Sequence, residues 1–454
     1  MGMRRRMNDP TPHPAHRRRI DPAVRRTIPG ANRPDGTPDD DDRVEIGPTP
    51  TAFAAWAEAG LRAPNLAAMR RYRLDRLVAE INRRDLAGLL CFDPINIRYA
   101  TDTTNMQVWI AHNPNRACFV AADGHLVLWD FKNCEHLSAH LPLISEVRSG
   151  VGFFHMMVAE RVDEVAARFA AEVAELMRAH GDANRRLAVD QIEVAGVAAL
   201  QALGITLYDG KAVADRARAI KGPDEIRATR CAIHSCEIAM RAMQDALTPG
   251  MTEADLWAVL HAENIRHGGE WIETRLLSSG PRTNPWYQEC GPRVICDGDI
   301  VAFDTDLVGV YGHCVDLSRA WLAGNGRPTE EQRRLYRIAH TQITDNIAAL
   351  EPGISYGEFS ARANTLTDEF RPQRYTVVLH GVGLCDEYPA IYYPQDQAAI
   401  GYDHTLEPGM ILSVESYVGV VGGREGVKLE QMILLTEDGV EDLTSYPFDE
   451  RLVG

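Results

Sequence analysis

The chain has 454 residues, of which 45% are hydrophobic and 25% are charged, and its formal net charge is −16. This composition is ordinary for a globular protein of two or three domains. The negative charge, together with the lack of a basic stripe interleaved with aromatic residues in the part expected to fold, argues against a nucleic-acid-binding protein.

The nine cysteines are scattered from Cys91 to Cys385 without a CxxC pair, which is typical of reduced thiols in the cytoplasm. No window approaches about 18 uninterrupted apolar residues, and the N-terminus lacks the apolar core of a signal peptide. We therefore expect a cytoplasmic protein that is neither exported nor inserted into a membrane.

The first 49 residues differ in composition from the rest. Residues 1–33 contain nine arginines and several prolines, and four consecutive aspartates reverse the sign of the charge at 39–42. This pattern predicts a disordered or extended arm. An arginine-rich arm could contact nucleic acid or an acidic partner, but a solvated tail that packs loosely on a second subunit is the simpler interpretation.

A first domain of α/β character is predicted over residues 50–213. Apolar residues recur at helical spacing over 65–84 and 158–180, which predicts two long helices. The patterns also predict a strand and turn over 86–99, a hairpin of 117–121 with 125–131 around Gly124, and a strand over 186–190. A linker over 214–223 ends at Gly222-Pro223, which opens a helix running from 224 towards 247.

An acidic β-hairpin is predicted at 301–321, inside a second domain over 224–454. Its first strand alternates apolar and acidic residues up to Asp304 and Asp306, and the chain returns through Asp316. Alternation places Asp304 and Asp306 on one face, where Asp316 could meet them across the pair. Three carboxylates at one place repel one another, so the pattern indicates a divalent cation, the alternative being a solvated acidic edge.

The same pattern recurs downstream, which indicates an internal duplication. The segment from Gly298 to Asp304 matches 409–415, and the segment from Gly312 to Asp316 matches 426–430, with Glu415 and Glu430 at the carboxylate positions. Helical patterns precede both copies, at 224–247 and from Thr252 in the first and at 329–349 and 355–370 in the second. Strands are predicted over 274–279 in the first copy and over 376–379, 410–417 and 427–435 in the second. Two similar halves would then bring carboxylates to a shared centre.

A histidine adds a nitrogen ligand to these carboxylates. His380 ends an apolar strand, and Gly381 and Gly383 behind it let backbone approach closely. One imidazole with several carboxylates suits iron, manganese, cobalt or zinc rather than copper(I), in a centre of two bridged ions. The candidate ligands are Asp304, Asp306, Asp316, His380, Glu415 and Glu430.

These residues resemble the motif of the creatinase, prolidase and aminopeptidase P group of "pita-bread" proteins, and the resemblance covers nearly the whole chain after residue 50. It implies an α+β protein in which a creatinase-like α/β domain over 50–213 and an Ile220-Lys221 linker precede a duplicated catalytic domain over 224–454. It also implies a homodimer with two divalent transition-metal ions in each chain, with iron as the first choice and manganese, zinc or cobalt as alternatives.

Two departures from the peptidases of this group bear on the function. The peptidases carry a histidine where this chain has Asp386, and another after the strand from which Ser279-Gly280 here runs into Trp286 and Tyr287. Those histidines bind peptide and assist the tetrahedral intermediate, so their loss argues against amide hydrolysis while the metal ligands remain.

With its paired aspartates and the segment LHGVGLCDEYP, the chain looks like the branch of dimethylsulfoniopropionate lyases. That resemblance implies a small-molecule substrate that loses a proton next to its carboxylate, with Asp386 as the expected base, and releases dimethyl sulfide and acrylate. An aromatic face can hold the sulfonium cation, and the candidates are Tyr375, Trp286, Tyr287, Trp109 and Tyr388. The alternatives are an Xaa-Pro peptidase or creatinase-like hydrolase on the same metal site, and a non-catalytic binding protein of the same fold.

Overall fold

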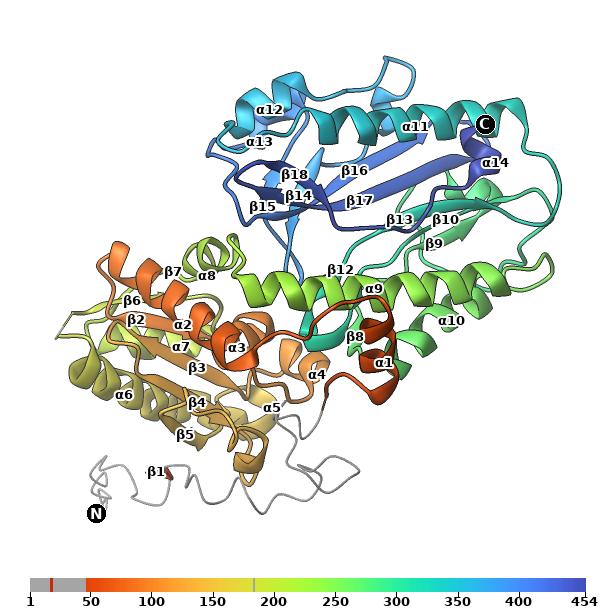
Figure 1. The fold of residues 1–454 in the computed structure, drawn as a ribbon. Helices are drawn as coiled ribbons and strands as arrows, with labels where there is room; N and C mark the ends of the chain where they lie inside the picture. The colour runs from red at the N-terminus through yellow and green to blue at the C-terminus, as the bar shows by residue number, and fades with distance from the viewer. Residues whose placement is uncertain (1–16, 19–45, 183) are drawn as a thin grey trace, which may run out of the picture. The chain divides into compact units, whose positions relative to one another are not determined.

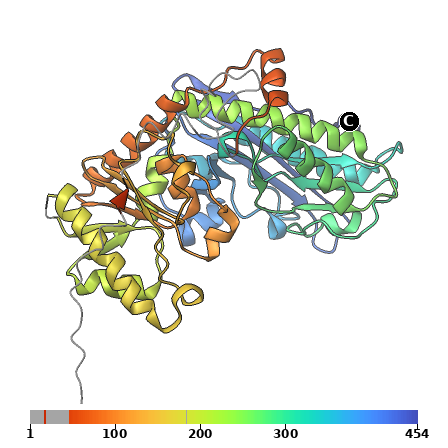
Figure 2. The same cartoon turned by 90° about the horizontal axis from the view of Figure 1, so that it is seen from below.

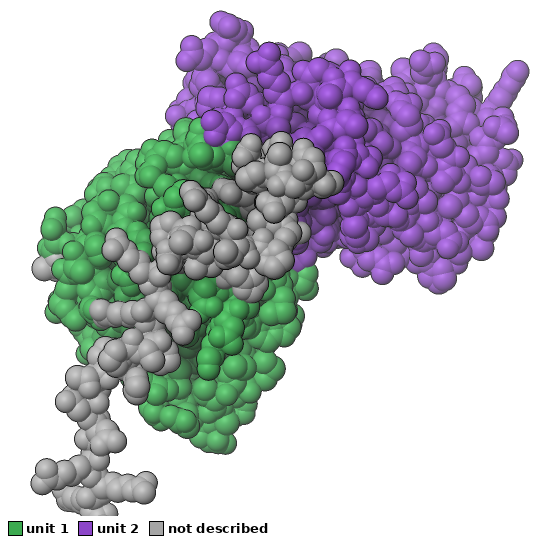
Figure 3. All heavy atoms as spheres, turned by 60° about the horizontal axis from the view of Figure 1, so that its bottom comes forward, with its two compact units in different colours: residues 1–45, 66–218 green, residues 46–65, 219–454 purple. Residues whose placement is uncertain are grey.

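The computed structural model describes residues 17–18, 46–182 and 184–454. The predicted N-terminal arm, residues 1–49, lies almost entirely outside these described residues. The chain divides into two compact units, one containing Leu66–Arg218 and the other containing Ile46–Asn65 and Ala219–Gly454 (Figure 3).

The segment Ile46–Asn65 belongs to the C-terminal unit, whereas the sequence analysis predicted that the N-terminal domain begins at residue 50. The reason is the short helix α1 (Pro50–Glu58), whose Trp56 is buried. The indole N–H of Trp56 donates to the carbonyl oxygen of Cys231 at 3.1 Å, and its ring stacks on Tyr311 with 5.9 Å between centroids. Because Cys231 lies 175 residues further along the chain, no local pattern could predict this packing.

The N-terminal unit is a mixed β-sheet with helices packed against it (Figure 1). Its strands are β1 (Arg17–Arg18), β2 (Gly88–Cys91), β3 (Ala117–Ala121), β4 (Leu126–Asp130), β5 (Glu146–Ser149), β6 (Arg186–Val189) and β7 (Thr206–Asp209), in the order β1-β5-β4-β3-β2-β6-β7. Its helices are α2 (Leu66–Arg83), α3 (Pro94–Thr101), α4 (Gln107–His112), α5 (His155–Val158), α6 (Val162–His180), α7 (Val194–Ala202) and α8 (Lys211–Arg218). The predicted hairpin is β3 and β4, and the two predicted long helices are α2 and α6.

Two stretches of this unit differ from the prediction. The predicted linker over 214–223 begins inside helix α8, which continues to Arg218. Residues 86–99 were expected to form a strand and a turn, but the strand β2 is followed by helix α3. The carboxylate of Asp93 accepts a hydrogen bond from the backbone N–H of Ile95 at 2.8 Å, and Pro94 occupies the first helical position. These are ordinary helix-start signals, so the helix was readable from the sequence.

The C-terminal unit contains three sheets. Its strands are β8 (Trp271–Ile272), β9 (Leu277–Ser279), β10 (Ile300–Asp304), β11 (Leu307–Val308), β12 (Cys314–Val315), β13 (Ser318–Leu322), β14 (Leu379–Val382), β15 (Asp386–Ile391), β16 (Ile411–Gly419), β17 (Gly426–Thr436) and β18 (Gly439–Asp442). Its helices after α1 are α9 (Pro223–Ala246), α10 (Glu253–Arg266), α11 (Glu330–Ala348), α12 (Tyr356–Arg362), α13 (Pro394–Ile400) and α14 (Glu450–Val453). Across the described ranges, every helix is too short or too polar to cross a lipid bilayer.

The predicted duplication is visible in the order of these elements. Helices α9 and α10, which lie side by side (Figure 2), precede a sheet in the order β9-β10-β13. Helices α11 and α12 precede a sheet that contains the corresponding run β14-β16-β17, and all of these strand pairs are antiparallel. Strand β17 also lies against β10 and β13, so the sheets of the two halves meet.

Two predicted boundaries in the second half are wrong. Helix α12 ends at Arg362 instead of continuing to 370, because Ala363 takes extended backbone angles and Leu366 has φ +62°. Strand β14 begins at Leu379 rather than at 376, so His380 lies inside the strand instead of at its end.

The acidic hairpin is interrupted where its carboxylates lie. Strand β10 pairs with β13, placing Asp304 opposite Ser318, whereas β11 pairs with β12 in a different sheet. Between them Asp306 has φ +34°, so the strand bends. The expectation that alternation along one continuous strand puts Asp304 and Asp306 on the same face is therefore wrong, although the bend still brings both carboxylates near Asp316.

Candidate metal centre

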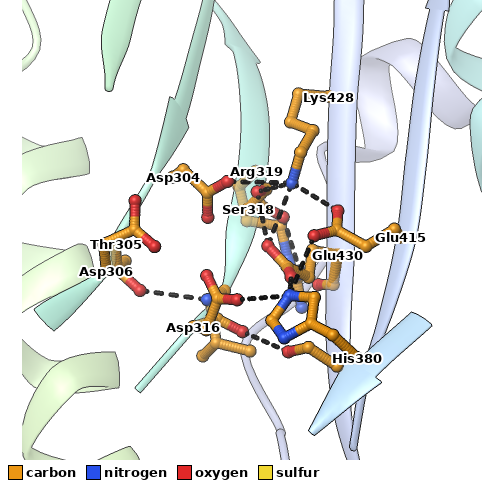
Figure 4. A network of polar contacts seen from close by, with 12 residues as sticks. Asp304, Thr305, Asp306, Asp316, Ser318, Arg319, His380, Glu415, Lys428 and Glu430 are labelled. Atoms are coloured by element: carbon orange, nitrogen blue, oxygen red, sulfur yellow. Dashed lines mark hydrogen bonds and ion pairs between the residues drawn. The ribbon is translucent and has the colours of Figure 1, made fainter. Parts of the chain in front are cut away.

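Carboxylates from both halves of the C-terminal unit converge between its sheets (Figure 4). The first half contributes Asp304 at the end of β10 and two aspartates beside β11 and β12, and the second half contributes one residue from each of β14, β16 and β17. Glu415 and Glu430 lie directly opposite each other in the β16–β17 register. The residues are Asp304, Asp306, Asp316, His380, Glu415 and Glu430, of which the five carboxylates are at most 6% exposed.

These side chains form two groups that share one aspartate. Asp316, His380, Glu415 and Glu430 offer ligand atoms that all lie within 4.8 Å of one another, and Asp304, Asp306 and Asp316 do the same. Among the described residues, neither group contains a histidine other than His380. A shared carboxylate between two ligand groups is the arrangement that a bridged pair of ions requires.

The orientation of His380 is set by its own backbone. Its Nδ1 lies 3.0 Å from the carbonyl oxygen of Gly381, so Nδ1 carries the proton there. Its Nε2 then faces the carboxylates, at 3.1 Å from Asp316 Oδ2 and 3.2 Å from Glu415 Oε1. A carbonyl partner on one ring nitrogen is the usual way in which a protein directs the other nitrogen to a metal.

The residues present fit divalent cations. Asp304 Oδ1, Asp316 Oδ1 and Glu430 Oε1 are buried and accept no hydrogen bond from any described residue. A buried carboxylate oxygen without a partner is costly, and buried charges are normally paired or bound to metal. Bound divalent ions would satisfy these oxygens, and oxygen-rich sets with one imidazole suit such ions.

Lys428 is the main component of the site that the sequence analysis missed. Its ammonium is fully buried and lies 2.9 Å from Asp304 Oδ2, 2.7 Å from Glu415 Oε2 and 3.0 Å from Glu430 Oε2. The hydroxyl of Ser318 accepts a further hydrogen bond from it at 2.6 Å. The sequence contained a signal for this contact, because a lysine two residues before Glu430 in a strand lies on the same face of the sheet as Glu430.

Burial among like charges shifts the proton affinities of the centre. Burial, together with repulsion from the carboxylates of Asp304 and Asp386, raises the pKa of Asp306 to about 9. Burial and the same kind of repulsion also raise the pKa values of Asp304 and Asp316. Burial by itself lowers the pKa of His380, but the surrounding carboxylates outweigh it and raise that pKa well above its usual value.

Asp386, the predicted base, opens strand β15 and reaches solvent. The protein packed around it raises its pKa, an effect that His380 opposes and that Glu430 and Asp304 reinforce. Its Oδ1 lies 3.8 Å from the thiol of the buried Cys314. The electrostatic influence of His380 and Glu430 on Asp386 indicates that the carboxylate belongs to the same charged neighbourhood as the candidate ligands.

Two of the aromatic residues predicted to hold a sulfonium already face a cation. The ammonium of Lys428 lies 4.7 Å from the ring centroid of Tyr375 and 5.9 Å from that of Trp286. Trp286 is also buried in the core, where its ring lies 6.1 Å from that of Tyr417. Tyr287 is 56% exposed and stacks on Tyr375 with 5.5 Å between centroids.

The other two aromatic candidates lie elsewhere. Tyr388 stacks on Tyr402 with 5.6 Å between centroids, within a cluster of aromatic rings. Trp109 belongs to the N-terminal unit, where it packs against Phe131 and Phe154. A substrate contact for either residue stays a prediction.

Comparison with known proteins places this centre in a family. Residues 227–437 match metallopeptidase family M24, and residues 73–220 match the creatinase/prolidase N-terminal domain. Membership of family M24 implies bound divalent metal ions. The chain is 51% identical to a protein of Roseovarius nubinhibens named dimethylsulfoniopropionate lyase DddP, over 448 residues that cover 97% of this chain and 99% of the relative. It is also 51% identical to the protein of the same name from Roseobacter denitrificans, over 444 residues that cover 96% of this chain and 98% of the relative.

The fold agrees with these matches. The solved structure of an Xaa-Pro dipeptidase from Bacillus anthracis superposes with a TM-score of 0.67 at 19% identity, covering 83% of this chain and 98% of the dipeptidase. At that identity the likeness concerns the fold alone, and it confirms the expected creatinase-like domain followed by a pita-bread domain. The chain therefore belongs to metallopeptidase family M24, within the group of proteins named dimethylsulfoniopropionate lyase DddP.

Proposed function

We propose that the protein is a lyase that cleaves dimethylsulfoniopropionate to dimethyl sulfide and acrylate. The observation that carries this proposal is the 51% identity to two proteins of that name over nearly the full length of both chains. Asp386 supports the same assignment, because the peptidases of the creatinase, prolidase and aminopeptidase P group have a histidine at its position.

In this proposal Asp386 takes a proton from the carbon next to the substrate carboxylate. The electron pair of that C–H bond becomes the double bond of acrylate, and the bond from the next carbon to sulfur breaks, with its pair leaving on dimethyl sulfide. Bound divalent ions would supply positive charge against the carboxylate of the substrate as negative charge develops. The candidates for holding the sulfonium stay Tyr287, Tyr375, Trp286, Trp109 and Tyr388, with the exposed ring of Tyr287 first and the buried Trp286 last.

We infer two divalent ions per chain, because the two ligand groups share Asp316. His380, Glu415 and Glu430 would complete one group, and Asp304 and Asp306 the other. Iron is the first candidate, with manganese, zinc and cobalt as alternatives, and elemental analysis of the purified protein decides between them.

We also propose a cytoplasmic homodimer. The family resemblance supports the dimer, and the nine cysteines, none of which forms a disulfide in the structure, support a reducing compartment. Light scattering on the purified protein tests the oligomeric state.

Gas chromatography of the headspace over purified protein and dimethylsulfoniopropionate tests the activity directly. We expect dimethyl sulfide in the headspace and acrylate in solution in equal amounts, both lost after treatment with a chelator and restored by added metal. Xaa-Pro dipeptides in a parallel assay should not be hydrolysed. Peptide turnover without dimethyl sulfide would establish the peptidase alternative, and no turnover of any kind would favour a binding protein.

A further inference from the structure

We propose that a buried ion pair between Lys221 and Glu387 positions Asp386. The inference rests on the proposed role of Asp386 as the base, and it assigns a purpose to the Ile220-Lys221 linker, which the metal centre does not use. Lys221 and Glu387 are positioning residues in this account, since neither would touch the substrate.

The ion pair is held at one end by fixed backbone. Lys221 Nζ lies 2.5 Å from Glu387 Oε1, and the two side chains are 3% and 1% exposed. The backbone N–H of Lys221 donates to the carbonyl oxygen of Gly409 at 2.9 Å, and the next residue, Gly222, is the N-cap of α9. A buried charge without a partner costs several kcal/mol of stability. If Glu387 left this position, the buried ammonium of Lys221 would be unpaired, so the ion pair holds Glu387 in place.

The two strands around Asp386 do not determine their own register. His380 in β14 lies opposite Ala390 in β15, but the next residue, Gly381, lies opposite Glu387. Tyr388 and Pro389 therefore form a bulge on β15, and pairing on one side of a bulge does not dictate pairing on the other. Glu387 is the first residue beyond this bulge, so its ion pair fixes the part of the strand that contains Asp386.

Alternation then decides where Asp386 points. Consecutive strand residues face opposite sides of the sheet, so Glu387, which points towards Lys221, requires Asp386 to point to the other side, where its Oδ1 lies 3.8 Å from the thiol of Cys314. The neighbouring glycines make room for this arrangement, because a Cβ on Gly383 would lie 2.3 Å from Glu387 Oε1. The backbone N–H of Cys314 donates to the carbonyl oxygen of Gly383 at 2.8 Å and holds the turn from the other side.

The test compares Lys221→Met, Glu387→Gln and the double variant with the wild-type metal-loaded enzyme. We expect each single variant to keep its metal content and KM and to lose about 10- to 100-fold in kcat, since a small misplacement of a reacting group has that effect. The isotope effect with substrate deuterated next to the carboxylate should rise, because proton transfer becomes slower. Amide hydrogen exchange in a peptide covering 382–391 should become faster.

Arg230→Met is the matched control, since Arg230 forms a more exposed ion pair with Glu441 in the same unit and should change none of these quantities. The double variant, which contains no unpaired buried charge, should regain part of the lost kcat, and it carries the test if Lys221→Met does not fold. Wild-type kcat and wild-type exchange in the folded variants would overturn the proposal. If the wild type releases no dimethyl sulfide, the proposed function fails, and hydrogen exchange alone judges the ion pair.

Discussion

Lys428 brings a fixed positive charge into the carboxylate cluster. Five buried carboxylates, Lys428 and two divalent ions would together carry no net charge. Lys428 contacts Asp304 through Oδ2 and Glu430 through Oε2, and the other oxygen of each carboxylate accepts no hydrogen bond from the described residues. The lysine therefore determines which oxygen of each carboxylate is available to an ion.

Replacing Lys428 by methionine should destabilise the metal-free protein. The change leaves three buried carboxylates without their shared cation, and breaking a buried ion pair from one side costs about 3–5 kcal/mol. We expect a loss of this size in denaturant unfolding of the metal-free protein, together with reduced metal content by elemental analysis. Arg230→Met, at the more exposed pair with Glu441, should cost less than about 1 kcal/mol. Unchanged stability and metal content in Lys428→Met would show that the lysine is dispensable.

Replacing Asp386 by asparagine tests the base directly. The amide keeps the shape of the carboxylate but cannot take a proton, so turnover to dimethyl sulfide should fall by a factor of about 10² or more. Metal content and substrate binding, measured by elemental analysis and calorimetry, should stay at the wild-type level. If metal is lost in proportion to activity, Asp386 instead supports a metal ligand, and another residue takes the proton.

At the scale of single elements, the two halves start corresponding helices in the same way. The hydroxyl of Thr252 accepts from the backbone N–H of Asp255 at 3.1 Å, and the hydroxyl of Ser355 accepts from that of Glu358 at 3.1 Å. The carboxylates of Asp255 and Glu358 in turn accept hydrogen bonds from the backbone N–H groups of the capping residues. The duplication therefore preserved the local chemistry that starts each helix, although the lengths of the helices diverged.

Thr252→Ala and Ser355→Ala should each lower the free energy of unfolding by about 1 kcal/mol, because each removes one N-cap hydrogen bond. Denaturant unfolding measures the effect, and metal content should not change. Thr344→Ala, at an exposed position inside α11, is the control and should be neutral or slightly stabilising. Losses well above about 2 kcal/mol would mean that the caps also support tertiary packing.

At the scale of the whole molecule, the carboxylate cluster should make stability depend on pH and metal. The folded state raises the pKa of Asp306 to about 9 and also raises the pKa values of Asp304, Asp316 and His380. Above about pH 4 the unfolded chain has lost aspartate protons that the folded chain retains, so the stability of metal-free protein falls as pH rises. Each such group contributes a slope of up to about 1.4 kcal/mol per pH unit.

We therefore expect the Tm of the metal-free protein to fall between about pH 5 and about pH 9, with the loss complete only above the folded pKa of Asp306. The metal-loaded protein should show a smaller change, because bound ions replace the protons. Scanning calorimetry of both forms over this range measures the difference. A metal-free Tm that rises with pH would contradict the proposed excess of buried carboxylates.

Local or repeated patterns in the sequence were enough to predict the elements and ligand candidates that carry such patterns. The strands of Glu415 and Glu430 have apolar runs bounded by glycine, and the repeat of the first-half pattern singled out both carboxylates as candidates, which the structure brings together with His380. The helical spacing of apolar residues predicted helices α2, α6, α9 and α11, because residues in consecutive turns form the apolar face of each helix.

Features that depend on contacts between residues distant in the chain could not be predicted and became visible only in the folded structure. Three such features are the bend at Asp306, the packing of α1 through Trp56 and the ion pair of Lys221 with Glu387. The residues next to them in the sequence show no pattern that would predict any of the three. Lys428 shows the physical reason most clearly. Its position in the strand could be predicted, but whether its charge faces water or three buried carboxylates depends on how two sheets pack together, which no local pattern encodes.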